Sequence, residues 1–104
     1  MKPEAADAIF AILGRREGDP DSRSWGEQYM ELSRIHRKGT PLEQAERLQR
    51  LYRRRSPSAA EERMITVLED ALFSNLAKAS KTTVADLRAR FHDGQPAFGS
   101  AQSR

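Results

Sequence analysis

The sequence SAAEERMITVLEDALFSNLAKA, residues 58–79, is the longest uninterrupted helical pattern in the chain. At 3.6 residues per turn, one broad face of such a helix would collect most of the apolar side chains in the stretch. Ser58 and Glu61 have the spacing of a capping box, in which each side chain satisfies a backbone N–H at the start of the helix. We therefore predict a central core helix here, with an inward face made of Met64, Ile65, Val67, Leu68, Ala71, Leu72, Leu76 and Ala79.

Two segments that precede this helix carry helix signals at both ends. Pro3 suits a first helical turn, where its missing N–H is not needed, and Gly14 can end that helix in the left-handed conformation. Ser24 and Glu27 have the spacing of another capping box at the start of a second helix, which we expect to end at Gly39. The predicted inward residues are Ala5, Ile9, Ile12 and Leu13 in the first helix, and Trp25, Tyr29, Leu32, Ile35 and His36 in the second.

Two further helices are predicted on either side of the central one in the chain. Thr40, Pro41 and Glu43 combine an N-cap, a proline at the first helical position and a glutamate at the third. Thr83 and Asp86 have the spacing of a cap for a short last helix. The predicted inward residues are Leu42, Ala45, Leu48, Leu51 and Tyr52 in the former, and Val84, Leu87 and Phe91 in the latter.

No segment alternates apolar and polar residues with a period of two, so no strand is expected. The predicted fold class is therefore all-α, a small orthogonal or bundle-like array of about five helices joined by short loops. Residues 1–94 are expected to form a single helical domain. Residues 95–104 are expected to form a disordered tail in which only Phe98 could dock.

The composition restricts the class of protein further. The chain has no cysteine, which excludes disulfides and thiolate metal sites. The apolar run at residues 8–13 is too short to span a bilayer, so we expect a cytoplasmic protein with no membrane association. The many alanines and arginines suit a bacterial, plasmid or phage origin.

The net charge of +3 conceals a strongly basic segment at residues 34–55. Its only acidic residues are Glu43 and Glu46, so its formal charge is +6. Along the third helix, Arg47, Arg50 and Arg54 would form a cationic stripe at i, i+3 and i+7. The basic residues of the segment are Arg34, Arg37, Lys38, Arg47, Arg50, Arg53, Arg54 and Arg55.

A solvated face, partly balanced by Glu43 and Glu46, is one interpretation of this segment. Phosphate binding is the other, because the planar guanidinium fork suits phosphate and carboxylate groups better than a lysine does. We therefore predict a small, non-enzymatic regulatory protein, with a homodimer expected, that binds nucleic acid mainly through phosphate contacts. The alternative is a protein-binding adaptor or inhibitor of the phage or plasmid type, whose basic face docks on an acidic partner surface.

Direct reading of bases by a helix-turn-helix motif fits the sequence poorly. The only candidate joins the end of the central helix to the short last helix through Lys81. Lys81 stands where this motif usually has a glycine, and the helix before it is longer than usual.

The sequence offers no convergent catalytic constellation. His36 and His92 are each isolated, and they are interpreted as a partly buried helix residue and a favourable charge near a helix C-terminus. Glu69 and Asp70 lack histidines at metal-binding spacing, so solvent exposure is expected for both. No catalytic residue, metal site or cofactor is predicted.

Phe73 and Asn75 do not fit the pattern of the central helix. Phe73 falls on the back of the helix, where either another helix covers it or it contacts an oligomer or partner. Asn75 falls inside the apolar face, where a polar residue needs a hydrogen-bond partner and can fix the register of a helix pair. Both are therefore candidate oligomer or partner contacts, whereas Trp25 and Tyr29 are interpreted as core residues.

Overall fold

The structure is a computed structural model that describes residues 1–15, 18, 22–54 and 56–92. These residues contain five α-helices and no β-strand, which confirms the predicted all-α class. The predicted tail, with Phe98, lies outside the described residues, as does the predicted boundary at residue 94. The helices are α1 (Pro3–Leu13), α2 (Trp25–Lys38), α3 (Pro41–Tyr52), α4 (Ala59–Ser80) and α5 (Val84–Leu87).

Side-chain caps fix where α2, α3, α4 and α5 begin. At the start of α4, the Glu61 N–H donates to Ser58 Oγ at 3.2 Å, and the Ser58 N–H donates to Glu61 Oε1 at 2.8 Å. Thr40 and Glu43 form the same capping box at the start of α3. These two predicted capping boxes are therefore confirmed, and each satisfies two backbone N–H groups that a helix terminus leaves without partners. The box predicted at Ser24 is only half formed, because Ser24 accepts from the Glu27 N–H but the Glu27 carboxylate accepts from the Ser24 hydroxyl instead of the Ser24 N–H.

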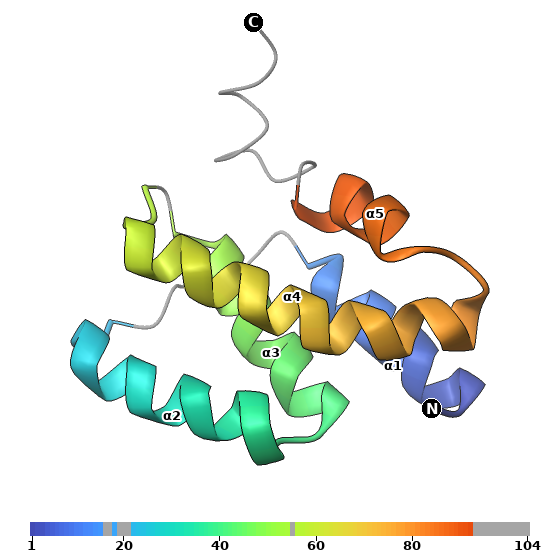
Figure 1. The fold of residues 1–104 in the computed structure, drawn as a ribbon, viewed down its shortest axis with the longest axis horizontal. Helices are drawn as coiled ribbons and strands as arrows, with labels where there is room; N and C mark the ends of the chain where they lie inside the picture. The colour runs from blue at the N-terminus through green and yellow to red at the C-terminus, as the bar shows by residue number, and fades with distance from the viewer. Residues whose placement is uncertain (16–17, 19–21, 55, 93–104) are drawn as a thin grey trace, which may run out of the picture.

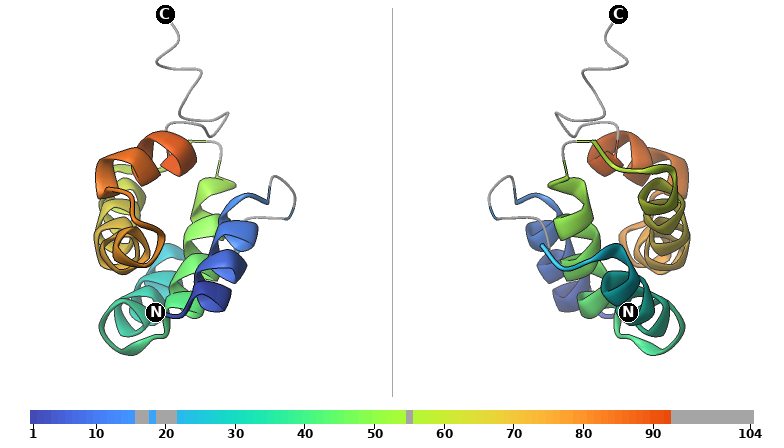
Figure 2. Two further views of the ribbon diagram at one scale, coloured as in Figure 1. Left: turned by 90° about the vertical axis from the view of Figure 1, so that its right-hand side faces the viewer. Right: turned by 90° about the vertical axis from the view of Figure 1, so that its left-hand side faces the viewer.

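The long helix α4 packs against every other helix of the fold. Figure 1 shows it crossing the molecule between α2 on one side and α5 on the other. In Figure 2, α1 and α3 lie side by side and face α4. Because neighbours surround α4, it buries residues around much of its circumference rather than along one stripe.

This arrangement decides between the two alternatives for Phe73, because another helical segment covers it and it is not an exposed partner contact. Phe73 is 0% exposed, and its ring centroid lies 6.2 Å from that of Phe91, which in turn lies 5.9 Å from that of Phe10. The fifth helical segment therefore covers the back of α4. Val67 is exposed instead, although it was predicted to face inward.

Three other predictions of burial are wrong for similar reasons. Asn75 is exposed, and its amide donates only to Ala71 O at 3.5 Å within the same helix. Tyr29 is 51% exposed, and Leu42 is exposed as well. Periodicity places Asn75 inside the apolar face of its helix and Tyr29 and Leu42 on theirs, but periodicity alone does not decide whether a neighbouring helix covers a position.

Two helix ends differ from the predictions. Gly14 has φ −79° and is right-handed, whereas Lys81 has φ 55° and ends α4 in the left-handed conformation. The Thr82 N–H donates to Ala77 O at 3.0 Å across this turn, which is the hydrogen bond of a Schellman motif. After α5, a π-helix continues over Arg88–His92, so the last turn that the structure describes is wider than that of an α-helix.

Candidate nucleic-acid interface

The candidate interface lies where the start of α2 approaches α3. Four arginine side chains surround one shallow depression, whose other lining residues are Gln28, Leu32 and Leu51. The four are Arg23, Arg47, Arg50 and Arg54, and we call them the arginine cluster. Arg23 was not predicted, because it lies outside the basic segment and only the fold brings it close.

Glu31 holds two members of the cluster. Arg23 Nη2 donates to Glu31 Oε1 at 2.6 Å, and Arg47 Nη2 donates to the same oxygen. The hydrogen bond from Arg23 and the charge of Arg47 lower the pKa of the Glu31 carboxyl below its usual value. Glu31 thus joins the segment before α2 to α3 through two arginines.

Arg54 contacts α4 rather than extending the stripe along α3. The helix ends at Tyr52, with Arg53 as its C-cap, so Arg54 lies beyond the helix. Its Nε lies 3.1 Å from Glu61 Oε2. Glu61 is only 4% exposed, and its other oxygen caps α4. Arg54 therefore joins the basic segment to the start of the central helix.

Arg23 is also placed by the backbone that precedes α2. The side-chain amide of Gln28 is buried, and its Nε2 donates to Arg23 O at 2.6 Å. The Ser24 hydroxyl caps α2 next to this contact, accepting from the Glu27 N–H at 3.4 Å. These two contacts hold the segment so that the Arg23 side chain meets Glu31.

The other predicted basic residues do not gather on one face. Arg34, Arg37 and Lys38 are exposed along α2, and Arg37 lies on the α4 side together with Arg63. Arg53 is half-buried, whereas Arg55 lies outside the described residues. The predicted basic residues thus lie on two sides of α2, with Arg47, Arg50 and Arg54 on one side and Arg37 on the other. Their role in binding stays a prediction.

The acids expected to balance the stripe are engaged elsewhere. Glu43 accepts from the Thr40 N–H at 2.9 Å in its capping box, and Glu46 Oε1 lies 3.3 Å from Arg15 Nη1. Glu31 on α2 and Glu61 on α4 contact members of the cluster instead. Pairing within one helix could be anticipated from spacing, but pairing between helices requires the fold.

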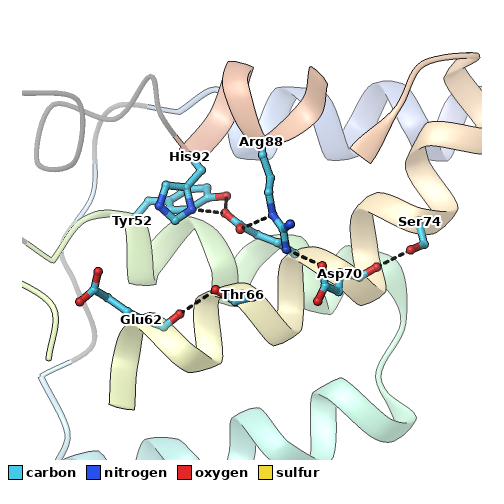
Figure 3. Close-up of polar contacts among 8 residues, drawn as sticks. Tyr52, Glu62, Thr66, Asp70, Ser74, Arg88 and His92 are labelled. Carbon is cyan, nitrogen blue, oxygen red and sulfur yellow. Dashed lines mark hydrogen bonds and ion pairs between the residues drawn. The ribbon is translucent and has the colours of Figure 1, made fainter. Parts of the chain in front are cut away.

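Behind α3, a buried carboxylate joins three helical segments. Glu69 is 1% exposed, which contradicts its predicted solvent exposure. Tyr52 Oη donates to Glu69 Oε2 at 2.6 Å, and His92 Nδ1 lies 2.8 Å from the same oxygen. Arg88 Nε donates to Glu69 Oε1 at 3.2 Å. Figure 3 shows Tyr52, Arg88 and His92 converging on this carboxylate.

The contacts of Glu69 hold helices together. Partial burial lowers the pKa of the Arg88 guanidinium, but the hydrogen bond to Glu69 and the charge of Asp70 raise it. The net result is a pKa above the usual value. Because Glu69 is almost fully covered, an outside molecule cannot reach its carboxylate. The network thus fixes α3 and the π-helix against α4.

The described residues contain neither a metal-binding group of side chains nor a helix that could cross a membrane. No group of three or more histidine, cysteine, aspartate or glutamate residues there could hold a metal ion. Within the same residues, every helix is too short or too polar to cross a membrane. The absence of an enzymatic activity and of a cofactor stays a prediction.

No protein-family model matches this chain, and no match was found among curated proteins or solved structures.

Proposed function

We propose that this protein binds nucleic acid through the arginine cluster, mainly by contacts to phosphate. The observation that supports the proposal is the gathering of four arginine side chains around one depression, where Arg23 and Arg47 contact Glu31 and Arg54 contacts Glu61. Arginines that are held close together in this way suit a phosphate backbone, because each phosphate accepts hydrogen bonds from a guanidinium fork.

The members of the cluster have different roles in this proposal. Arg47 and Arg54 are partly covered and paired with glutamates. In this proposal they hold the surface in shape and add to its positive electrostatic potential. Arg50 is exposed on α3 and is the residue best placed to meet a phosphate directly. Binding of this kind depends little on sequence, which suits a small regulator that acts in the cytoplasm.

The experiment that tests the proposal is the Arg50→Glu variant. We expect it to weaken binding of both a DNA duplex and a single strand, measured by fluorescence anisotropy, while the fold is retained. The matched control is Lys2→Glu, which changes the net charge equally at an exposed residue before α1. Equal loss of affinity in both variants would mean that only net charge matters and would contradict the proposal.

The second candidate function is an adaptor or inhibitor that binds an acidic protein surface. The same gathering of arginines supports it, because a guanidinium fork pairs with carboxylates as well as with phosphates. Affinity capture with and without nuclease treatment separates the two. A partner that is retained after nuclease, and is lost in Arg50→Glu, would favour the adaptor.

A further inference from the structure

A second surface lies on the opposite flank of α2, where this helix packs beside α4. It is a groove with a volume of about 460 Å³. Trp25, Tyr29, Met64 and Val67 supply apolar surface there, and Arg37 and Arg63 add two guanidinium groups. None of the described residues that line the groove carries a carboxylate. The groove therefore combines aromatic rings with uncompensated positive charge.

The two aromatic residues are accessible to a ligand. Trp25 is half-buried and Tyr29 is 51% exposed. Their ring centroids lie 6.0 Å apart, and the ring planes are inclined by 58°. Because about half of the Tyr29 surface is exposed, a flat partner can reach its ring, and aromatic rings prefer offset or tilted contacts with one another.

We propose that this groove binds unpaired bases of a single-stranded nucleic acid, with the flanking phosphates at Arg37 and Arg63. The inference rests on the proposed function and names its substrate class. Aromatic side chains for stacking next to cations for the backbone are the combination by which proteins hold single strands without reading their sequence. A base within a duplex is already stacked on its neighbours and would not be available to Tyr29.

The dimensions of the groove favour nucleotides over a helical peptide. Its volume falls within the range of about 300–1,000 Å³ that is usual for small ligands. An amphipathic helix would need a longer groove, with pockets for residues at i, i+3, i+4 and i+7. Since α2 is only about 10–12 Å across with its side chains, a short strand could contact both this groove and the arginine cluster.

Trp25 provides a direct readout, because it is the only tryptophan in the chain. The full-length protein would be titrated with oligothymidylate, with a duplex of equal length, and with polyphosphate as an anion without bases. We expect oligothymidylate to quench the Trp25 fluorescence, and we expect polyphosphate to bind without quenching. Quenching by an acidic aromatic peptide, with none by oligothymidylate, would identify a protein partner and overturn the inference.

The Tyr29→Ala variant tests the stacking contact. Because a base stacked on an aromatic side chain is worth about 1–3 kcal/mol, the affinity for oligothymidylate should fall by about 5- to 150-fold. The affinity for the duplex should hardly change, and Tyr29→Phe should bind like the wild type. Met30→Ala is the matched control, since Met30 is 76% exposed and does not line the groove.

The outcomes separate this inference from the proposed function. If duplex and single strand bind equally, without quenching and without an effect of Tyr29→Ala, the groove is not a base-binding site and the arginine cluster remains the interface. If neither nucleic acid binds at all, the proposed function fails, and this inference fails with it. Circular dichroism of Tyr29→Ala confirms that a loss of affinity does not come from unfolding.

Discussion

The phenol of Tyr52 donates a 2.6 Å hydrogen bond to the carboxylate of Glu69, and this contact ties α3 to the central helix α4. Both side chains are almost completely buried. Tyr52 is the last residue of α3, directly before the basic residues Arg53 and Arg54. The hydrogen bond therefore fixes the end of the helix that carries half of the arginine cluster.

Removal of this hydrogen bond should destabilise the fold. Tyr52→Phe keeps the ring but takes a donor from a buried carboxylate, which should lower the free energy of unfolding by about 1–3 kcal/mol. Urea denaturation measures the change. Tyr29→Phe is the control, because Tyr29 is exposed and its variant should stay within about 0.5 kcal/mol of the wild type. Equal stability of the two variants would show that the contact contributes nothing.

Arg54 and Arg50 should respond differently to charge reversal. Arg54→Glu would place a carboxylate next to the buried Glu61, and we expect a loss of about 1–3 kcal/mol, reduced by the partial exposure of the site. Arg50→Glu should change stability by no more than about 0.5 kcal/mol, because Arg50 is exposed. Thermal unfolding of the two variants tests this difference, and an unaltered melting temperature in Arg54→Glu would argue against the Glu61 pairing.

Gly26 in the first turn of α2 and Gly39 at its C-cap offer a matched pair of substitutions. A Cβ at Gly39 would lie 2.6 Å from Ile35 O and 2.9 Å from Ile35 Cα, whereas a Cβ at Gly26 would meet nothing within 4 Å. Gly39→Ala should therefore cost about 1–3 kcal/mol, as overpacking does. Gly26→Ala should stabilise the helix by up to about 1 kcal/mol. Chemical denaturation of both should show opposite signs, and a neutral Gly39→Ala would mean that the helix end shifts at little cost.

Glu31 should contribute stability that depends on pH. The Arg23 hydrogen bond and the Arg47 charge lower its pKa in the folded state below the usual 4.5, so the ionised form is the one that folding favours. Its contribution is complete above pH 4.5 and is lost as the pH falls through the lowered value. Glu31→Gln should therefore be less stable than the wild type at neutral pH, with a difference that shrinks in acid.

The control for this pH dependence is Glu46→Gln. Glu46 pairs with Arg15 on the surface, where both side chains are more than half exposed, and such pairs contribute little to stability. Its variant should unfold like the wild type at every pH. A difference between Glu31→Gln and the wild type that does not vary with pH would contradict the assigned charge pairing.

Much of the fold could be predicted because its signals are local. Capping boxes such as Ser58 with Glu61 involve residues three apart, and periodicity identified Ile65, Leu68, Leu72 and Leu76 as core. The sequence left two alternatives open for Phe73, because its burial depends on Phe91, which is distant in sequence. The left-handed Lys81 was missed as well, since no local signal marks a lysine for that conformation.

The candidate site was predicted less well, because its contacts join different helices. Arg47 and Arg50 could be selected from charge and spacing, but Arg23 joins them only through Glu31. The burial of Glu69 had no signal in its own helix, since its partners Tyr52, Arg88 and His92 come from other segments. The groove beside α4 went unnoticed because Trp25 and Tyr29 have the spacing of core residues.

The salt dependence of binding tests the central claim most directly. For the wild type, log affinity for nucleic acid should fall linearly with log salt concentration, because phosphate contacts release counterions. Arg50→Gln removes one contact, so its slope should be shallower by about 0.7–0.9, whereas Lys2→Gln should keep the wild-type slope. An affinity that does not depend on salt, or an unchanged slope in Arg50→Gln, would contradict the assignment of the arginine cluster as a phosphate-binding surface.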